Sequence, residues 1–221
     1  MDGIGTIVEH GETVSVDLTA TIDEQWTGTR ADHRNQINRA IRAGHRAYID
    51  DDWAHEATFV DIYTATMNRV GASASYMFGA DYVRALRTAL GSRLSLCVVD
   101  IGGTIAAAGL FTEECGIVQY HLSGTDGAFI RERPTKLMLH FIRGYMKERN
   151  DRVLHLGGGL GGADDSLFEF KAGFSRRRHP FRTWRVIVDP ARYASLSRAA
   201  DPTVDLEDAT GFFPLYRRAP L

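Results

Sequence analysis

Apolar residues recur at helical spacing through the first part of the chain. The clearest case is residues 52–70, where one apolar stripe runs along the segment and Gly71 follows as a stop. Residues 29–46 and 82–90 show the same periodicity. Ahead of them, residues 13–18 alternate as TVSVDL, which predicts a short strand. We therefore expect one strand followed by helices.

The pattern then changes to the two-residue alternation of strands. Residues 94–99 and 104–111 are rich in β-formers, and the Gly102-Gly103 pair between them is typical of a hairpin turn. A second turn leads into residues 117–122. These segments predict a meander of antiparallel strands.

Helices and strands alternate after the meander. Residues 135–149 form an amphipathic helical pattern, and residues 153–156 form a short apolar strand. The remaining signals predict a helix at 166–172, a strand at 183–188 and a helix at 190–199. The order of these elements predicts that the short apolar strand lies parallel beside the meander and splays from it.

The whole pattern is that of one α/β domain with a mixed central sheet flanked by helices. A chain of 221 residues suits one large domain, and no internal repeat or low-complexity linker divides it. Residues 1–12 and 200–221 are expected to be peripheral tails.

Composition narrows the class of protein. Hydrophobic residues make up 44% and charged residues 24% of the chain, as is ordinary for a globular domain. The amino-terminal residues lack the basic region and apolar run of a signal peptide, and no apolar stretch approaches the ~20 residues that cross a bilayer. Cys97 and Cys115 lie in strand-like segments and are expected to be reduced and buried. We therefore expect a cytoplasmic protein.

Arginines gather in two places although the net charge is only −2. The predicted helix at 29–46 carries one group and a later triplet forms the other: Arg30, Arg34, Arg39, Arg42, Arg46, Arg176, Arg177 and Arg178. Such patches suit the phosphates of a donor molecule or of RNA. They are equally typical of a solvated helix face and a loop, so both interpretations stand.

A glycine run follows the strand at 153–156, and it comprises Gly157, Gly158, Gly159, Gly161 and Gly162. It fits a dinucleotide-binding fingerprint only loosely because no βαβ unit surrounds it, and no Gly-Lys-Ser/Thr follows as in a Walker A motif. Bare backbone here either lets a substrate lie close to the strand end or forms a turn.

The segment YHLSGTD ends the meander and holds a histidine beside hydroxyl groups. Strict alternation places Tyr120 and Leu122 on one face and His121 and Ser123 on the other. A strand-end histidine is a candidate general base, although most lone histidines are hydrogen-bonded structural residues. No G-x-S-x-G motif supports a hydrolase triad, and the spacing of the histidines predicts no metal site.

Lys171 stands in the segment LFEFKAGF, among Phe168, Phe170 and Phe174. A lysine in aromatic surroundings can have a lowered pKa and can stabilise the charge of an oxyanion. The alternative is an aromatic core from which the Lys171 side chain extends to solvent.

The segments YHLSGTD, PTKLMLHFIRGYMKER, VLHLGGG and DSLFEFKAGFS, in this order, resemble the Fem-type aminoacyltransferases and their single-domain relatives. That family lies within the N-acyltransferase (GNAT) superfamily, and its best-known members move amino acids from aminoacyl-tRNA onto a peptidoglycan precursor. The segments TRADHRNQINRAIRAGHRAYID and SYMFGADYVRAL extend the resemblance over roughly residues 13–190. The resemblance implies a GNAT-like α/β fold with a splayed mixed sheet, and the activity of an acyltransferase.

The resemblance also implies roles for particular residues. Lys171 would stabilise the oxyanion, and His121 is our candidate for deprotonating the amine. The implied donor-binding residues are Phe170, Arg131, Arg133, Thr135, Lys136, Gly157, Gly158 and Gly159. The implied acceptor-binding residues are Tyr76, Tyr82, Tyr120, Ser123 and Thr125. A tRNA donor would contact Arg30, Arg34, Arg42, Arg176, Arg177 and Arg178.

Two departures from the family shape the functional expectation. Bridge-forming members carry two such domains, whereas this chain has room for one, and the loop GAFIRERPTK replaces the R/Q-x-x-G-x-G/A signature of acetyl-CoA enzymes. We expect direct transfer of an aminoacyl or acyl group to a small-molecule or peptide amine. Aminoacyl-tRNA or acyl-CoA would be the co-substrate, with no permanently bound cofactor. The alternatives are an ordinary CoA-dependent N-acetyltransferase and a catalytically silent relative that binds RNA or a protein partner.

Overall fold

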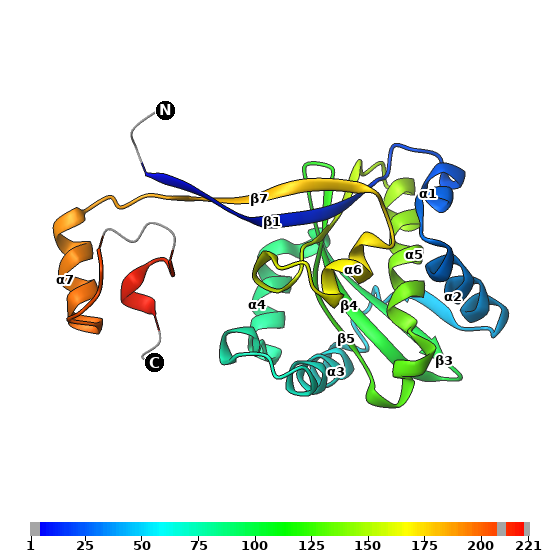
Figure 1. The fold of residues 1–221 in the computed structure, drawn as a ribbon. Coiled ribbons are helices and arrows are strands. Elements are labelled where there is room, and N and C mark those ends of the chain that lie inside the picture. The colour runs from blue at the N-terminus through cyan, green and yellow to red at the C-terminus, as the bar shows by residue number, and fades with distance from the viewer. Residues whose placement is uncertain (1–4, 207–210, 219–221) are drawn as a thin grey trace.

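Seven strands form one mixed sheet in the computed structural model, which describes residues 5–206 and 211–218 (Figure 1). The strand order is β2-β3-β4-β5-β6-β1-β7. Strands β3 (Leu94–Ile101), β4 (Thr104–Glu114) and β5 (Ile117–Thr125) follow one another in the chain and pair antiparallel. The expected meander is confirmed.

Strand β6 (Val153–Gly157) lies parallel to β5 but pairs with it only at the start of both strands. Residues 117–119 match residues 153–155, and the pairing ends there. Every other neighbouring pair in the sheet is antiparallel. The predicted parallel neighbour, splayed from the meander, is confirmed.

Strands β1 (Thr6–Asp17) and β7 (Arg177–Arg185) form a long arm at the edge of the sheet (Figure 1). Helix α7 (Pro190–Ala200) lies at the far end of this arm, where Tyr193 stacks on Phe213 with ring centroids 5.9 Å apart. The arm therefore carries the carboxyl-terminal elements away from the helices that cover the sheet.

The extent of the arm differs from the sequence prediction. Strand β1 begins at Thr6, so residues 6–12, expected in a tail, are strand. Strand β7 covers 177–185 where a strand was expected at 183–188. The segment TIVEHGE has too little apolar alternation to predict a strand, and pairing with β7 supplies its backbone hydrogen bonds instead.

Helices cover both faces of the sheet (Figure 1). Helices α3 and α4 lie on one face, and helices α1, α2, α5 and α6 lie on the other. Their bounds are α1 Ile22–Gly28, α2 Ala31–Arg42, α3 Glu56–Arg69, α4 Ala80–Leu90, α5 Pro134–Glu148 and α6 Ser166–Ala172. All of these except α1 correspond to helices expected from the sequence.

Two elements were missed by the sequence prediction. Helix α1 is only seven residues long and is set by a capping box, in which Thr21 and Glu24 each bond the backbone nitrogen of the other. Strand β2 (Arg46–Ile49) begins at the last residue of the segment expected as helix, where no strand was expected. Helix α2 stops before Gly44, whose φ of 78° turns the chain out of the helix.

The core has a layer on each side of the sheet. Phe111, Met138 and Ile142 are fully buried between the sheet and α5, and Phe59 is fully buried under α3. Cys97 is buried as expected, and burial raises the pKa of its thiol.

The expectation for Cys115 is wrong. Cys115 is exposed, because it lies in the turn between β4 and β5 with a φ of 52° and not in a strand.

Gly124 fixes how closely α3 approaches β5, which gives a matched pair of variants. A Cβ at Gly124 would stand 2.7 Å from the carbonyl oxygen of Ile62, whereas a Cβ at Gly144 in α5 would meet no atom within 4 Å. We expect Gly124→Ala to destabilise the fold by about 1–3 kcal/mol through overpacking. Gly144→Ala should stabilise it by about 0.5–1 kcal/mol through helix propensity. Urea unfolding of both variants measures the difference, and equal midpoints would contradict it.

Candidate active site

Strands β5 and β6 diverge after their last pair, Gln119 and His155, and we call this opening the splay. A pocket of about 810 Å³ lies there, on the face of the sheet that carries α5. The residues that line it are Arg30, Asp32, His33, Arg69, Tyr120, Ser123, Thr125, Ile130, Arg133, Thr135, Lys136, Ser166, Leu167, Glu169 and Phe170. Four of these carry positive charge and two are carboxylates, so the pocket attracts anions.

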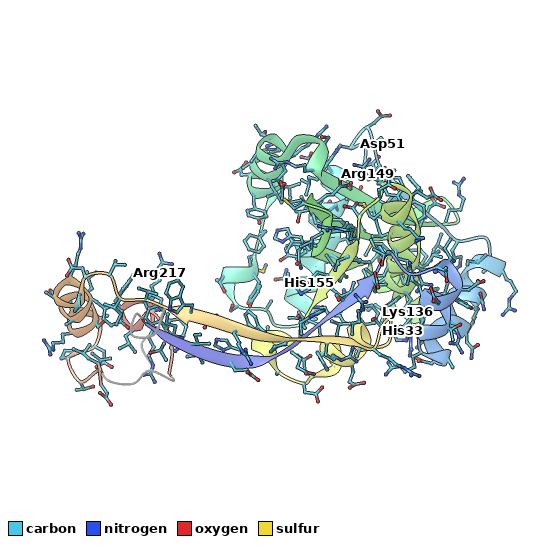
Figure 2. The ribbon with its side chains drawn as sticks, turned by 90° about the horizontal axis from the view of Figure 1, so that it is seen from above. His33, Asp51, Lys136, Arg149, His155 and Arg217 are labelled. Carbon is cyan, nitrogen blue, oxygen red and sulfur yellow. The ribbon has the colours of Figure 1, made fainter. Side chains whose placement is uncertain are left out.

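A buried lysine lies at the start of α5, at the base of this pocket. The Nζ atom of Lys136 lies 2.9 Å from Nδ1 of His33 and 3.3 Å from Oδ2 of Asp32. Nε2 of His33 lies 3.0 Å from the Phe170 carbonyl oxygen, which only accepts, so Nε2 carries the proton and Nδ1 accepts from Lys136. Figure 2 shows His33 and Lys136 together. Lys136 on α5 is thus connected to Asp32 and His33 on α2 and, through His33, to Phe170 on α6.

Burial lowers the pKa values of both basic groups in this cluster. The charge of Lys136 lowers the pKa of His33 further, while Asp32 partly restores that of Lys136. Burial raises the pKa of Asp32, but hydrogen bonds and nearby positive charge, including those of Lys136, outweigh it and hold the carboxyl well below its usual range.

Helix α5 begins next to this cluster. Arg133 precedes the helix with a φ of 51°, a left-handed conformation that costs energy for a residue with a side chain. Its guanidinium donates to Gln36 on α2 at 3.2 Å, and Thr135 hydrogen-bonds Thr125 at the end of β5 at 2.9 Å. The start of α5 is therefore tied to both α2 and β5 at the pocket.

A β-bulge decides which side chains of β5 face the pocket. Phe111 pairs with Tyr120 and Leu110 pairs with Leu122, so His121 is an extra residue between them. Tyr120 and Ser123 consequently hydrogen-bond each other on the pocket side, and burial raises the pKa of Tyr120 to about 12. The faces expected from strict alternation are wrong because the bulge shifts the register.

His121 points to the other face of the sheet. Its Nε2 lies 2.8 Å from the hydroxyl of Tyr82 on α4, and burial lowers the pKa of its imidazole. Tyr76 is exposed in the turn between α3 and α4. The expected acceptor residues therefore divide: Tyr120, Ser123 and Thr125 line the pocket, whereas Tyr76 and Tyr82 do not.

Lys171 is buried at the end of β6. Its Nζ donates to the carbonyl oxygen of Gly158 at 2.6 Å and lies 3.3 Å from where a Cβ on Gly157 would stand. Burial lowers its pKa to about 8, while Asp165 acts in the opposite direction. The side chain is only 9% exposed, so the alternative in which Lys171 extends to solvent is wrong. Its neighbour Phe170 lines the pocket.

The glycine run packs against other backbone. A Cβ on Gly158 would stand 2.6 Å from the carbonyl oxygen of Glu12, and one on Gly159 would stand 2.0 Å from that of Ala163. Both positions need glycine because the chain passes so close to β1 and to itself. Of the expected donor residues, Phe170, Arg133, Thr135 and Lys136 line the pocket, whereas Arg131 and these glycines do not.

The two arginine groups have mixed surroundings. Arg30 lines the pocket and pairs with Asp32 and Glu169. Arg34 donates to the carbonyl oxygens at the end of α1, with 2.7 Å to Thr29, so its role is structural.

The other arginines lie outside the pocket. Arg42 and Arg176 are exposed. Arg177 pairs with Asp17, and Arg178 lies over the ring of Phe168 at 5.4 Å.

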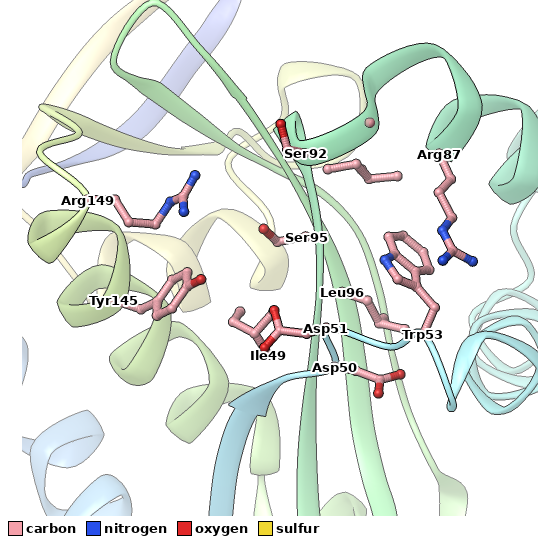
Figure 3. A pocket seen from close by; sticks show the side chains of 12 residues that line it. Ile49, Asp50, Asp51, Trp53, Arg87, Ser92, Ser95, Leu96, Tyr145 and Arg149 are labelled. Carbon is pink, nitrogen blue, oxygen red and sulfur yellow. The ribbon is translucent and has the colours of Figure 1, made fainter.

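A second cavity of about 420 Å³ lies at the other end of α5 (Figure 3). Trp53 and Tyr145 form aromatic walls, and Arg87 lies over the Trp53 ring at 4.6 Å. Its arginines already have partners, since Arg87 pairs with Glu56 and Arg149 with Glu113. Figure 2 shows Arg149 well separated from Lys136. This cavity is therefore separate from the pocket at the splay, and the two have no lining residue in common.

Sequence reasoning missed Asp32, His33 and Arg69 as pocket residues. Their helical segments carry no motif, and only the crossing of α2 and α3 with the end of β5 brings them to one place. Asp32 lies between Arg30 and Arg34 in the sequence, and this mixture of charges was a usable signal for a charged site.

Neither a metal centre nor a membrane span emerges from the described ranges, 5–206 and 211–218. There, no three His, Cys, Asp or Glu side chains are grouped so that they could hold a metal ion. No helix in those ranges is long and apolar enough to cross a membrane.

A mixed sheet opened at one parallel pair, with a long helix starting beside the opening, defines a GNAT-like domain, and the expected fold class is confirmed. Residues 28–171 match the family described as Acetyltransferase (GNAT) domain, and the chain belongs to that family. No curated protein matches the chain.

Solved structures share the fold at low sequence identity. FemX superposes with a TM-score of 0.69 and 12% identity, over 85% of this chain and 64% of FemX. L-PGS from Bacillus licheniformis superposes with a TM-score of 0.57 and 16% identity, over 86% of this chain and 65% of L-PGS. The chain thus spans less than two thirds of either protein, and the likeness concerns the fold alone.

Proposed function

We propose that this chain transfers an aminoacyl or acyl group from an activated donor directly onto an amine. The observation that carries the proposal is the splay between β5 and β6, with a cationic pocket on one side and the Lys171 ammonium at the end of β6. A carbonyl group held in that opening would have a positive charge beside it. Membership of the GNAT family supports the class of reaction.

Aminoacyl-tRNA is the donor that the pocket favours over acyl-CoA. In the loop before α5, the carboxylate of Asp126 accepts from the backbone N–H of Ala128 at 2.8 Å. A negative charge therefore occupies a backbone amide that a phosphate would otherwise use. Arg30, Arg69 and Arg133 line the pocket, and their charges would attract a phosphodiester backbone. The Fem-type resemblance of the sequence supports the same donor.

The reaction needs no covalent enzyme intermediate. The amine nitrogen attacks the donor carbonyl carbon, and the C=O electron pair moves onto oxygen. The resulting oxyanion collapses and expels the ribose oxygen or thiol sulfur, which takes up the proton that the amine gives up. Lys171 would stabilise the oxyanion, and holding both reactants at the splay supplies much of the remaining acceleration.

Label transfer to a simple amine tests the proposed function. The full-length protein is incubated with glycinamide and either bulk tRNA charged with labelled amino acids or labelled acetyl-CoA. We expect labelled amide from charged tRNA at a higher rate than from acetyl-CoA. A higher rate from acetyl-CoA would assign the donor to CoA, and no labelled amide from either donor would overturn the function.

Donor binding is expected to weaken steeply with salt if the donor is tRNA. Phosphates held by the four pocket cations release counterions, so affinity should fall about 50-fold between about 50 and 200 mM salt for four contacts to a single strand. Fluorescence anisotropy of labelled tRNA measures this slope. Arg30→Gln removes one of the four contacts and should reduce the slope by about a quarter, whereas Arg84→Gln on α4, outside the pocket, should leave it unchanged. A flat profile for the unmodified protein would contradict tRNA as donor.

A further inference from the structure

His155 lies on β6 where the splay begins, on the face of the sheet away from α5. Leu154, the residue before it, is buried in the core under α5, so alternation directs His155 to the opposite face. Gln119, its partner in the last β5–β6 pair, faces the same way because Val118 is buried in that same core. The His155 ring is partly exposed there.

The hydrogen bonds of Gln119 fix the tautomer of His155. The amide nitrogen of Gln119 donates to the carbonyl oxygen of Tyr120 at 3.0 Å. The amide oxygen is therefore the atom that lies 2.5 Å from Nδ1 of His155, and an oxygen can only accept. Nδ1 of His155 must carry the proton, and the neutral ring presents Nε2 as an unprotonated nitrogen.

Among the described residues, hydrogen bonds leave Nε2 without a partner in His45, His140 and His155, and of these three only His155 lies on β6 at the splay. Nε2 already has a hydrogen-bond partner in His10, His33, His55, His121 and His179. His121, expected from the sequence as the base, has its Nε2 occupied by Tyr82.

Burial and nearby charge shift the pKa of His155 in one direction. Burial lowers the pKa of its imidazole, and the charges of His179 on β7 and Lys171 on α6 lower it further. The facing groups on β5 and β1 are the uncharged Gln119 and Ser15. The Lys171 ammonium likewise disfavours a second positive charge beside it, so an amine bound there gives up its proton more readily. Lys171 lies at Gly157 and Gly158, about 7 Å further along β6.

We propose that His155, rather than His121, accepts the proton of the acceptor amine, which enters the splay from the face opposite the donor pocket. This role rests on the proposed transfer function. As the C–N bond forms, Nε2 takes one proton from the amine nitrogen. The imidazolium then returns this proton to the leaving ribose oxygen or thiol sulfur as the C–O or C–S bond breaks. Gln119 acts as a positioning residue that holds Nδ1–H.

The test compares two amines of different basicity in the full-length protein. Asparagine keeps the Nδ1-type donor toward Gln119 but has no base, so His155→Asn should lower transfer from charged tRNA to glycinamide about 10²-fold. Transfer to hydroxylamine, a weakly basic amine that is unprotonated at neutral pH, should change far less. The pH profile of the unmodified protein should show an acid limb below the ordinary range of histidine, and His155→Asn should lose that limb. His10→Asn, on the arm, serves as the unchanged control.

Nitrogen NMR of histidine-labelled protein provides a readout that does not need turnover. We expect His155 as the neutral Nδ1–H tautomer at neutral pH, with a shift toward Nε2–H in Gln119→Leu. An Nε2–H or charged His155 overturns the proposal whatever the activity. Unchanged transfer to glycinamide in His155→Asn, or a larger loss in His121→Asn, also overturns it. Failure of the unmodified protein to transfer to either amine would instead overturn the proposed function, and the tautomer would show separately whether the ring is held as described.

Discussion

Lys171→Met is expected to lower turnover by about 10²–10³, the usual cost of losing one oxyanion-stabilising donor. The ammonium of Lys171 lies at the end of β6, where the splayed strands would hold the reacting carbonyl. It is buried, so little water competes with its interaction with developing charge. Methionine keeps the length and apolar character of the lysine side chain without its charge. Single-turnover kinetics with saturating donor measures the chemical step alone.

The same variant separates loss of chemistry from loss of fold. Folding depresses the pKa of Lys171 from 10.5 to about 8, so the native protein destabilises the charged form. That cost, about 3 kcal/mol, is fully present below about pH 8 and is relieved as pH rises toward 10.5. Lys171→Met should therefore be at least as stable as the unmodified protein at neutral pH, and stability should rise less steeply with pH above about 8.

Arginine at the same position is the matched control. Lys171→Arg keeps the charge but replaces a compact ammonium with a planar guanidinium that does not fit the hydrogen bond to Gly158, so it should rescue poorly. Turnover of the unmodified protein should fall as pH rises through about 8, because Lys171 loses its proton there. Near-normal turnover in a folded Lys171→Met protein would remove Lys171 from the mechanism.

Lys136→Met should weaken donor binding by about 10- to 100-fold with a much smaller effect on the chemical step. A hydrogen bond to a charged group contributes about 1.5–3 kcal/mol, and Lys136 is the buried cation at the base of the pocket. The readout is the split between KM for charged tRNA and kcat.

The contacts of Lys136 supply the control for that experiment. His33 and Asp32 lose their shared donor in Lys136→Met, so the effect on donor binding needs a control that leaves α2 in place. Asp32→Asn keeps Lys136 in place and removes the one carboxylate charge beside its ammonium, so it should tighten rather than weaken binding of an anionic donor. A fall in kcat with unchanged KM in Lys136→Met would place Lys136 outside donor binding.

Long periodic segments made most of the fold predictable from the sequence. The stripe that predicts α3 and the alternation that predicts the meander each extend over many residues and are set by burial on one face. Helix α1 and strand β2 are too short to show a hydrophobic period. Helix α1 depends on a capping box, and strand β2 depends on pairing with β3. Strand β1 depends on a partner more than 150 residues away in the chain, at β7.

The site was predictable only in part, because side-chain direction depends on local irregularities. Phe170 and Lys136 come from segments with a family resemblance, and both line the pocket. The bulge at His121 reverses the expected faces of β5, and no sequence signal marks it. His155 was seen only as part of a short apolar strand, since its free Nε2 follows from the orientation of the Gln119 amide.

The intact mass of the protein and its product, quenched during a single turnover, tests direct transfer onto an amine. The unmodified protein is mixed with charged tRNA and glycinamide, and protein and small molecules are weighed together at successive times. The account predicts aminoacyl-glycinamide as the product and no mass added to the protein at any time. A protein mass increased by one aminoacyl group during turnover, or free amino acid as the only product, would contradict direct transfer to an amine.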